Sequence, residues 1–171
     1  MNIGILGTGV VGRTIGTKLV QLGHEVRMGS RTADNPIAHA WAQDNGQRAS
    51  HGTFADAAAF GEILFNCTAG VHSLEVLELA GAAHLRGKIL VDVANPLDFS
   101  QGMPPSLAFC NTDSLGERVQ RAFPEAKVVK TLNTVNCSVM VNPALAGGEH
   151  DMFICGNDGG AKATVAGILK E

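Results

Sequence analysis

The sequence contains no tyrosine, a single tryptophan and no closely spaced pair of cysteines. The absence of tyrosine excludes the carbonyl reductases that act through a Tyr-x-x-x-Lys pair. The four cysteines, Cys67, Cys110, Cys137 and Cys155, show neither CxxC nor Cys/His ligand spacing, so no metal site is expected. Scattered cysteines favour reduced thiols over a disulfide framework, and we therefore expect a cytoplasmic protein.

Long apolar runs and blocks of one charge are also missing. No run reaches the ~18 residues of a membrane-spanning helix. The first expected strand begins at residue 2, which leaves no room for a signal peptide. Only 17% of residues are charged, the net charge is −3, and Lys and Arg form no cluster. This pattern supports neither a nucleic-acid partner nor an anionic membrane partner.

What the chain does have is a high apolar content of 45% and 21 glycines among 171 residues, which is typical of one α/β domain with tight turns. Apolar strands alternate with helical patterns. The expected strands cover residues 2–6, 24–29, 47–50, 62–68, 88–94, 126–132 and 152–155. The expected helices run from the glycine turn to 22, and over 35–45, 53–60, 73–83, 114–124 and the last residues to 171, with a loop at 99–105.

This alternation predicts an α/β Rossmann fold, a doubly wound parallel sheet in a three-layer αβα arrangement. We expect a single domain, residues 1–171, that binds its ligand at the carboxyl ends of the strands. The chain stops inside the last expected helix. Either the fold is short or a C-terminal closing segment is absent from this chain.

The first ligand motif is Gly-Thr-Gly-Val-Val-Gly at residues 7–12. It follows a strand, opens a helix and lies in a unit of about the ~30 residues expected of βαβ. Gly7 makes the turn, Gly9 lets a phosphate approach and Gly12 allows close helix–strand packing. Backbone N–H groups at the start of a helix attract a pyrophosphate. The motif therefore predicts a dinucleotide site rather than a glycine-rich turn without a ligand.

The end of the second strand indicates which dinucleotide binds. An acidic residue there would bond the ribose 2′-hydroxyl of NAD, but the chain carries Ser30, Arg31 and Thr32 instead, with no carboxylate before Asp34. A guanidinium pairs well with a 2′-phosphate, and the two hydroxyls add hydrogen-bonding groups. These residues predict NADP(H), the alternative being an exposed, solvated Arg31.

Three later strand ends are expected to line the same crevice: residues 67–72, 94–97 and 133–136. Their backbone and amide groups suit the ribose, the pyrophosphate and the nicotinamide carboxamide. Alternatively, Asn95-Pro96 is an ordinary strand-ending turn, and Asn133 and Asn136 satisfy loop backbone.

Two titratable residues, His72 and Asp92, are candidates for a chemical role here. His72 is the residue there suited to acid–base work, although capping of the next helix or contact with the ribose is the preferred interpretation. Asp92 either orients a loop or is a buried carboxylate satisfied by the backbone. No residue is assigned as catalytic.

Four segments of this chain carry a family resemblance: residues 3–12, 29–32, 91–97 and 128–136, with the capped helix 114–124 before the last of them. Together they resemble the deazaflavin (coenzyme F-420)-dependent NADP oxidoreductases and their relatives, which include the NADPH-binding domain of the six-transmembrane ferric reductases. The resemblance covers almost the whole chain. The Ser-Arg, Asn-Pro-Leu and Lys-Thr-Leu-Asn-Thr combinations are its most specific parts.

The resemblance implies hydride transfer between NADPH and a small redox acceptor stacked on the nicotinamide, either deazaflavin coenzyme F-420 or a flavin. It also implies a homodimer, the commonest oligomer in general. An NADP(H)-binding sensor without chemistry, or a reductase for another small acceptor, remains an alternative. The motifs and the resemblance together predict these cofactor-binding residues: Gly7, Thr8, Gly9, Val10, Val11, Gly12, Ser30, Arg31, Thr32, Thr68, Ala69, His72, Ala94, Asn95, Pro96, Thr134 and Asn136.

Overall fold

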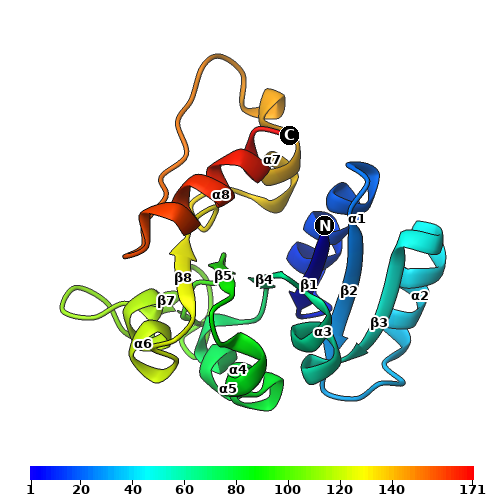
Figure 1. The fold of residues 1–171 in the computed structure, drawn as a ribbon. Coiled ribbons are helices and arrows are strands. Elements are labelled where there is room, and N and C mark those ends of the chain that lie inside the picture. The colour runs from blue at the N-terminus through cyan, green and yellow to red at the C-terminus, as the bar shows by residue number, and fades with distance from the viewer.

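Six parallel strands form the central sheet, in the order β3-β2-β1-β4-β5-β8 (Figure 1). The computed structural model describes all 171 residues. The strands are β1 (Asn2–Leu6), β2 (Glu25–Ser30), β3 (Ala49–Thr53), β4 (Ile63–Asn66), β5 (Ile89–Asp92) and β8 (Lys127–Lys130). The strand order reverses at β1, which pairs with β2 on one side and β4 on the other. The expected Rossmann sheet is confirmed, with its ligand-binding switch point at β1.

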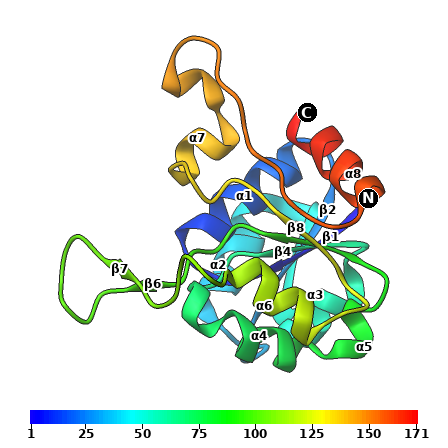
Figure 2. The same ribbon diagram turned by 90° about the vertical axis from the view of Figure 1, so that its left-hand side faces the viewer.

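Helices cover both faces of this sheet and make the three layers (Figure 2). One face carries α1 (Val10–Gln21), α2 (Pro36–Asn45) and α8 (Gly159–Leu169), and the other carries α3 (Phe54–Phe60), α4 (Ser73–Ala80), α5 (Ala82–Leu85) and α6 (Leu115–Ala122). The alternation of side chains along each strand supplies both cores. In β1, Ile3 and Ile5 pack with α1, whereas Leu6 packs with α3 and α4.

Small residues let the layers approach closely. A Cβ on Gly4 of β1 would lie 2.4 Å from the carbonyl oxygen of Ala57, so α3 rests directly on the strand backbone. On the other face, a Cβ on Gly16 of α1 would lie 2.8 Å from the indole ring of Trp41. The indole Nε1 also donates to Thr17 Oγ1 at 3.0 Å. These contacts hold α1, α2 and α3 in fixed positions around the end of β1.

The expected strand at residues 152–155 is wrong. Only Cys155 meets the sheet, through one antiparallel bridge in which it and Lys130 exchange backbone hydrogen bonds of 2.8 and 2.9 Å. The chain touches the β8 edge at this point and then turns to α8, where the Asp158 carboxylate accepts a hydrogen bond from the Ala161 N–H. The chain runs beside β8 for too few residues to form the repeated backbone hydrogen bonds of a strand.

Several other elements differ from the expectation. The helix expected over 73–83 is interrupted at Gly81, whose φ of +88° ends α4 and separates it from α5. The expected loop at 99–105 is the tip of a projecting hairpin formed by β6 (Leu97–Asp98) and β7 (Ser106–Leu107) (Figure 2). The short helix α7 (Cys137–Val141) and the 3₁₀ turn after it were not expected. No helix in the chain has both the length and the apolar character needed to cross a membrane.

Candidate functional site

The glycine turn between β1 and α1 is folded tightly against its neighbours. Gly7 has a φ of +123°, a conformation that residues with a side chain rarely adopt, and a Cβ there would lie 2.7 Å from the carbonyl oxygen of Cys67. A Cβ on Gly12 would lie 2.3 Å from the carbonyl oxygen of Gly7. Both glycines are therefore required by backbone contacts, and Gly12 packs as closely as the motif predicts.

The first turn of α1 forms an open cradle of backbone donors. Gly9 is the N-cap residue and offers no capping side chain, and the first turn holds no acidic residue. The first hydrogen bond of the helix runs from Arg13 N to Gly9 O at 3.1 Å, which leaves the N–H groups of Val10, Val11 and Gly12 without partners in the chain. A Cβ built on Gly9 would meet nothing within 4 Å. Free amides, a helix N-terminus and open space fit a pyrophosphate.

The end of β2 lies beside this cradle. Gly7 N donates to Gly29 O at 3.1 Å, which ties the glycine turn to the strand. Ser30 is buried and its hydroxyl donates to the carbonyl oxygen of Thr32, so Ser30 shapes the turn that follows. Arg31 and Thr32 are exposed, and the Arg31 guanidinium lies 3.8 Å from the Glu75 carboxylate. Of the three residues predicted here, Arg31 and Thr32 are thus the two whose side chains are exposed.

The loops after β4 and β5 are joined backbone to backbone. Gly70 N donates to Asn95 O at 3.1 Å, and a Cβ on Gly70 would lie 2.3 Å from that same oxygen. Sequence reasoning placed this loop correctly but missed the role of Gly70, because an isolated glycine in a loop carries no spacing pattern. The contact fixes the two loops side by side at the carboxyl ends of β4 and β5, with Ala69 exposed and Pro96 buried.

A buried polar network lies beneath that surface, at the carboxyl ends of β4, β5 and β8. Asn66 and Asp92 have no exposed surface. Asn66 Nδ2 donates to Asp92 Oδ1 at 2.9 Å, Ala94 N donates to the same oxygen at 3.2 Å, and Lys130 Nζ donates to Asp92 Oδ2 at 2.9 Å. Lys130 also bonds the carbonyl oxygen of Ala94. Asp92 is therefore a buried carboxylate satisfied by side chains as well as backbone, and it orients the loop that holds Ala94.

Thr68 belongs to the same network. Its hydroxyl donates to Asn66 Oδ1 at 2.7 Å and lies 2.9 Å from Ser73 Oγ. The Thr68 side chain thus links the end of β4 to the start of α4. Sequence reasoning missed Asn66, Ser73 and Lys130. No local pattern identifies Lys130, since its pairing with Asp92 depends on the register of β5 and β8 in the sheet.

The loop after β8 is held by amide side chains. Asn95 Nδ2 donates to Asn133 O at 2.7 Å, and Asn133 Nδ2 donates to Asn95 Oδ1 at 3.1 Å. Leu132 adopts a φ of +64°, unusual for a buried leucine, and this bend turns Asn133 towards Asn95. Asn136 is the N-cap of α7 and accepts from Ser138 N at 3.0 Å. The side chain of Asn136 therefore satisfies loop backbone, as one interpretation expected, whereas that of Asn133 bonds the Asn95 side chain instead. Thr134 is exposed.

His72 lies at the N-cap position of α4, but its side chain makes no capping hydrogen bond, so the capping interpretation is wrong. The imidazole is 57% exposed, and its Nδ1 lies 3.6 Å from the Glu75 carboxylate. His72 and Arg31 therefore approach the same carboxylate from two different loops. No acid–base partner other than Glu75 is close to the imidazole.

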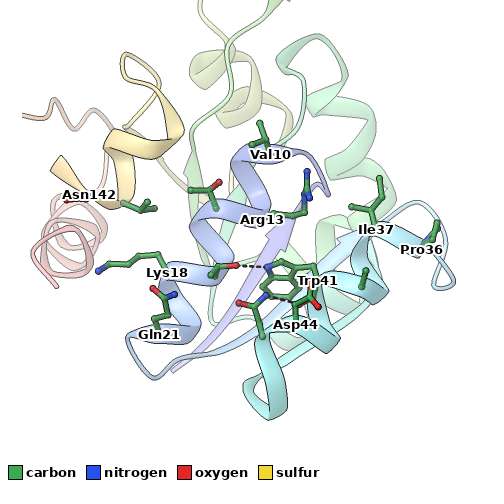
Figure 3. A pocket seen from close by; sticks show the side chains of 14 residues that line it. Val10, Arg13, Lys18, Gln21, Pro36, Ile37, Trp41, Asp44 and Asn142 are labelled. Atoms are coloured by element: carbon green, nitrogen blue, oxygen red, sulfur yellow. Dashed lines mark hydrogen bonds between the residues drawn. The ribbon is translucent and has the colours of Figure 1, made fainter. Parts of the chain in front are cut away.

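A large hollow in the surface adjoins the cradle at Val10. A groove of about 1150 Å³ runs along the outer side of α1, between α2 and α7 (Figure 3). Val10 is the one predicted cofactor residue that lines it, at the end where the Arg13 side chain also lies. Lys18 and Gln21 lie towards the other end of α1.

The sheet order, the tight glycine turn and the free amides at the start of α1 define a dinucleotide-binding Rossmann domain. Residues 2–96 match the protein family described as NADP oxidoreductase, coenzyme F420-dependent. The chain belongs to this family of NADP-dependent oxidoreductases, as its motifs predicted. The matched residues contain the glycine turn, the end of β2 and the joined loops after β4 and β5.

Two relatives resemble the chain over nearly its whole length. A crystal structure from Arthrobacter sp. FB24, assigned as an F420-dependent NADP-reductase, has 53% sequence identity and a TM-score of 0.91, covering 98% of this chain and 79% of that one. The metalloreductase STEAP3 of Rattus norvegicus is 31% identical over 170 residues. The match covers 98% of this chain but only 31% of STEAP3, so the chain spans about a third of that relative.

More distant structures share the fold alone. An imine reductase from Aspergillus terreus in complex with NADPH4 has 20% identity and a TM-score of 0.69. A pyrroline carboxylate reductase from Plasmodium falciparum with NADP bound has 16% identity and a TM-score of 0.62. In both cases the chain covers about half of the other protein, 51% and 54% respectively.

Proposed function

We propose that this protein binds NADP(H) across the carboxyl ends of β1, β2, β4 and β5 and passes a hydride between the nicotinamide and a small redox acceptor. The observation that carries the proposal is the pairing of two features. An unblocked helix N-terminus follows Gly9, and an exposed guanidinium stands at the end of β2, where an NAD-specific protein has a carboxylate. Membership in a family of NADP oxidoreductases supports it.

The chain contributes binding and orientation. The N–H groups of Val10, Val11 and Gly12 bind the pyrophosphate, and Arg31 and Thr32 bind the 2′-phosphate. The loops after β4, β5 and β8, which hold the remaining predicted residues, line the ribose and the nicotinamide with backbone groups and with the exposed side chains of Ala69, His72 and Thr134. Because Gly70 is bonded to Asn95 and Asn95 to Asn133, these three loops form one floor of fixed shape. A fixed floor sets the angle at which a nicotinamide meets its acceptor, and such positioning supplies much of the catalysis in hydride transfer.

For the acceptor we propose deazaflavin coenzyme F-420 or a flavin, a planar ring that stacks on the nicotinamide. NADPH supplies the hydride when it is bound. The family description and the assignment of the Arthrobacter protein favour the deazaflavin. We also propose that the protein is a cytoplasmic homodimer. Sedimentation velocity of the purified protein tests the dimer directly.

The first experiment measures cofactor choice by titration calorimetry with NADPH and NADH. NADPH should bind much more tightly, and Arg31→Ala should cost about 1.5–3 kcal/mol of NADPH binding free energy, the scale of a charged hydrogen bond. That loss corresponds to about 10-fold to 150-fold in affinity. Arg86→Ala is the matched control, since Arg86 is equally exposed and pairs with Glu125 on the surface. Equal affinities for the two cofactors would contradict the assignment.

The second experiment follows NADPH oxidation at 340 nm with F-420, FAD, FMN and ferric chelates as acceptors. Turnover with the deazaflavin, and none with the chelates, is the expected result. Tight NADPH binding without turnover of any acceptor would instead support a sensor or regulatory module that binds the cofactor without chemistry.

A further inference from the structure

The Glu75 carboxylate lies between the Arg31 guanidinium and the His72 imidazole of the proposed cofactor site. Its Oε1 is 3.8 Å from an Arg31 guanidinium nitrogen, and its Oε2 is 3.6 Å from His72 Nδ1. The sequence shows no acid at the end of β2, but the fold brings one there from the first turn of α4. Glu75 is the sole carboxylate that forms an ion pair with Arg31.

We propose that Glu75 is a specificity-determining residue that competes with the cofactor 2′-phosphate for Arg31; the proposal rests on the NADP(H) site described above. Without cofactor, the carboxylate holds the guanidinium at the edge of the crevice. A 2′-phosphate that binds Arg31 has to displace this internal anion. Glu75 therefore sets how strongly the site distinguishes a phosphorylated ribose from an unphosphorylated one.

The geometry suits an exchange of partners. Both side chains of the Arg31–Glu75 pair are more than half exposed, and pairs of this kind contribute little free energy, so the contact separates easily. The released carboxylate keeps a partner, because His72 lies one helical turn before it. Arg31 has no such second partner in the chain, so its exchange is with the ligand.

The size of the effect follows from the charges. The released Glu75 carboxylate remains on α4 near Arg31, so it and a 2′-phosphate bound to Arg31 repel each other through water-exposed surroundings. At low salt, removal of the carboxylate charge should tighten binding of a 2′-phosphate by about threefold to tenfold. The affinity for a ligand with a free 2′-hydroxyl should change by less than about twofold, because such a ligand has no 2′-phosphate for Glu75 to repel.

The experiment measures the dissociation constants of 2′,5′-ADP and 5′-ADP, which differ only in the 2′-phosphate. The proteins are the parent chain, Glu75→Gln and the control Glu78→Gln, which removes the same charge one turn further along α4. We expect Glu75→Gln alone to bind 2′,5′-ADP more tightly. The gain should shrink when the salt is raised from about 50 to 500 mM. Thermal melting of each variant monitors any loss of α4, since an acidic side chain in a first turn stabilises a helix.

Unchanged or weaker binding of 2′,5′-ADP by a folded Glu75→Gln protein would overturn the inference, and weaker binding would make Glu75 a residue that positions Arg31. Equal gains in 2′,5′-ADP affinity in Glu75→Gln and Glu78→Gln would show that the effect comes from net charge alone, and this too would overturn the inference. Arg31→Ala separates this inference from the proposed function. If Arg31→Ala leaves the affinity for 2′,5′-ADP unchanged, the site itself is wrong. If it weakens binding while Glu75→Gln does nothing, only the role of Glu75 fails.

Discussion

The buried pair of Lys130 and Asp92 offers the sharpest test of how the site is supported. Lys130→Met keeps the length of the side chain but removes the ammonium group. Asp92 then retains the donors on Oδ1, from Asn66 and Ala94, and loses the donor on Oδ2. Because Asp92 has no exposed surface, water cannot replace the lost partner.

The magnitude follows from that burial. Breaking a buried pair by removing one partner costs about 3–5 kcal/mol, which is a large share of the roughly 5–15 kcal/mol that stabilises a typical domain. Asp92→Asn should cost less, about 1–3 kcal/mol, since Lys130 is 21% exposed and can reach water. The double variant leaves no unpaired charge. We therefore expect it to be more stable than Lys130→Met alone, with a strongly non-additive cycle.

Urea unfolding measures all four proteins, with the single tryptophan as the reporter. Trp41 is 4% exposed and packs in the core between α1 and α2, so its fluorescence responds to global unfolding. The urea unfolding transitions of the variants should shift in their midpoints, while the dependence of the unfolding free energy on urea concentration stays the same. A cost below about 1 kcal/mol for Lys130→Met, or single costs that simply add in the double variant, would refute the view that Asp92 depends on its lysine.

Three further predictions follow from single residues. Gly70→Ala should weaken NADPH binding and cost about 1–3 kcal/mol of stability, because the new Cβ meets the Asn95 backbone. The control is Gly167→Ala, where a Cβ meets nothing within 4 Å, and equal melting temperatures of the two variants would contradict the clash. Burial, and then the nearby Asp92, raise the pKa of the Cys67 thiol, so brief maleimide labelling read by mass spectrometry should modify Cys110 and Cys155 in the native protein but Cys67 only after unfolding. Hydrogen bonds from Arg121 and then Arg118 lower the pKa of Asp113 to about 2 from 3.8, so Asp113 stabilises the fold above pH 4 and loses this effect as the pH falls towards 2. The difference in unfolding free energy between the parent and Asp113→Asn should therefore vanish over that range. A difference that stays constant with pH would contradict a role for the two ion pairs.

The fold and the pyrophosphate cradle could be predicted from the sequence because both depend on local patterns. Apolar runs of strand length alternate with helical stripes, and the glycines at 7, 9 and 12 have a spacing with one structural meaning. The strand expected at 152–155 shows the limit of such patterns. Met152 and Ile154 are partly buried against the core and Phe153 between them is exposed, which is the alternation of a strand. Backbone pairing, however, depends on how long the chain runs beside β8, which no local pattern records.

The arrangement of the loops after β5 and β8, the proposed nicotinamide end of the crevice, could not be predicted because their contacts join residues far apart in the chain. Asn95 and Asn133 are 38 positions apart, as are Lys130 and Asp92. The sequence identified Asn95 as a residue of the site, but it could not show that the amide is already engaged by Asn133. Glu75 was missed for the same reason: it reaches Arg31 only after the crossover of the fold brings α4 beside the end of β2.

The two ends of the proposed site thus depend on different groups, backbone N–H groups at one end and side chains at the other, and mutations should affect them differently. At the pyrophosphate end the donors are backbone N–H groups, and the Val10 side chain is 59% exposed, so replacing Val10 by another helix-forming residue removes no donor. At the nicotinamide end the loop positions depend on side chains such as Asp92, Lys130 and Asn133, each bonded to another loop or strand. A change there moves a whole loop. Sequence variation that alters the acceptor while keeping NADP(H) should therefore concentrate in side chains at the ends of β5 and β8, where the floor of the site can be reshaped without disturbing the cradle.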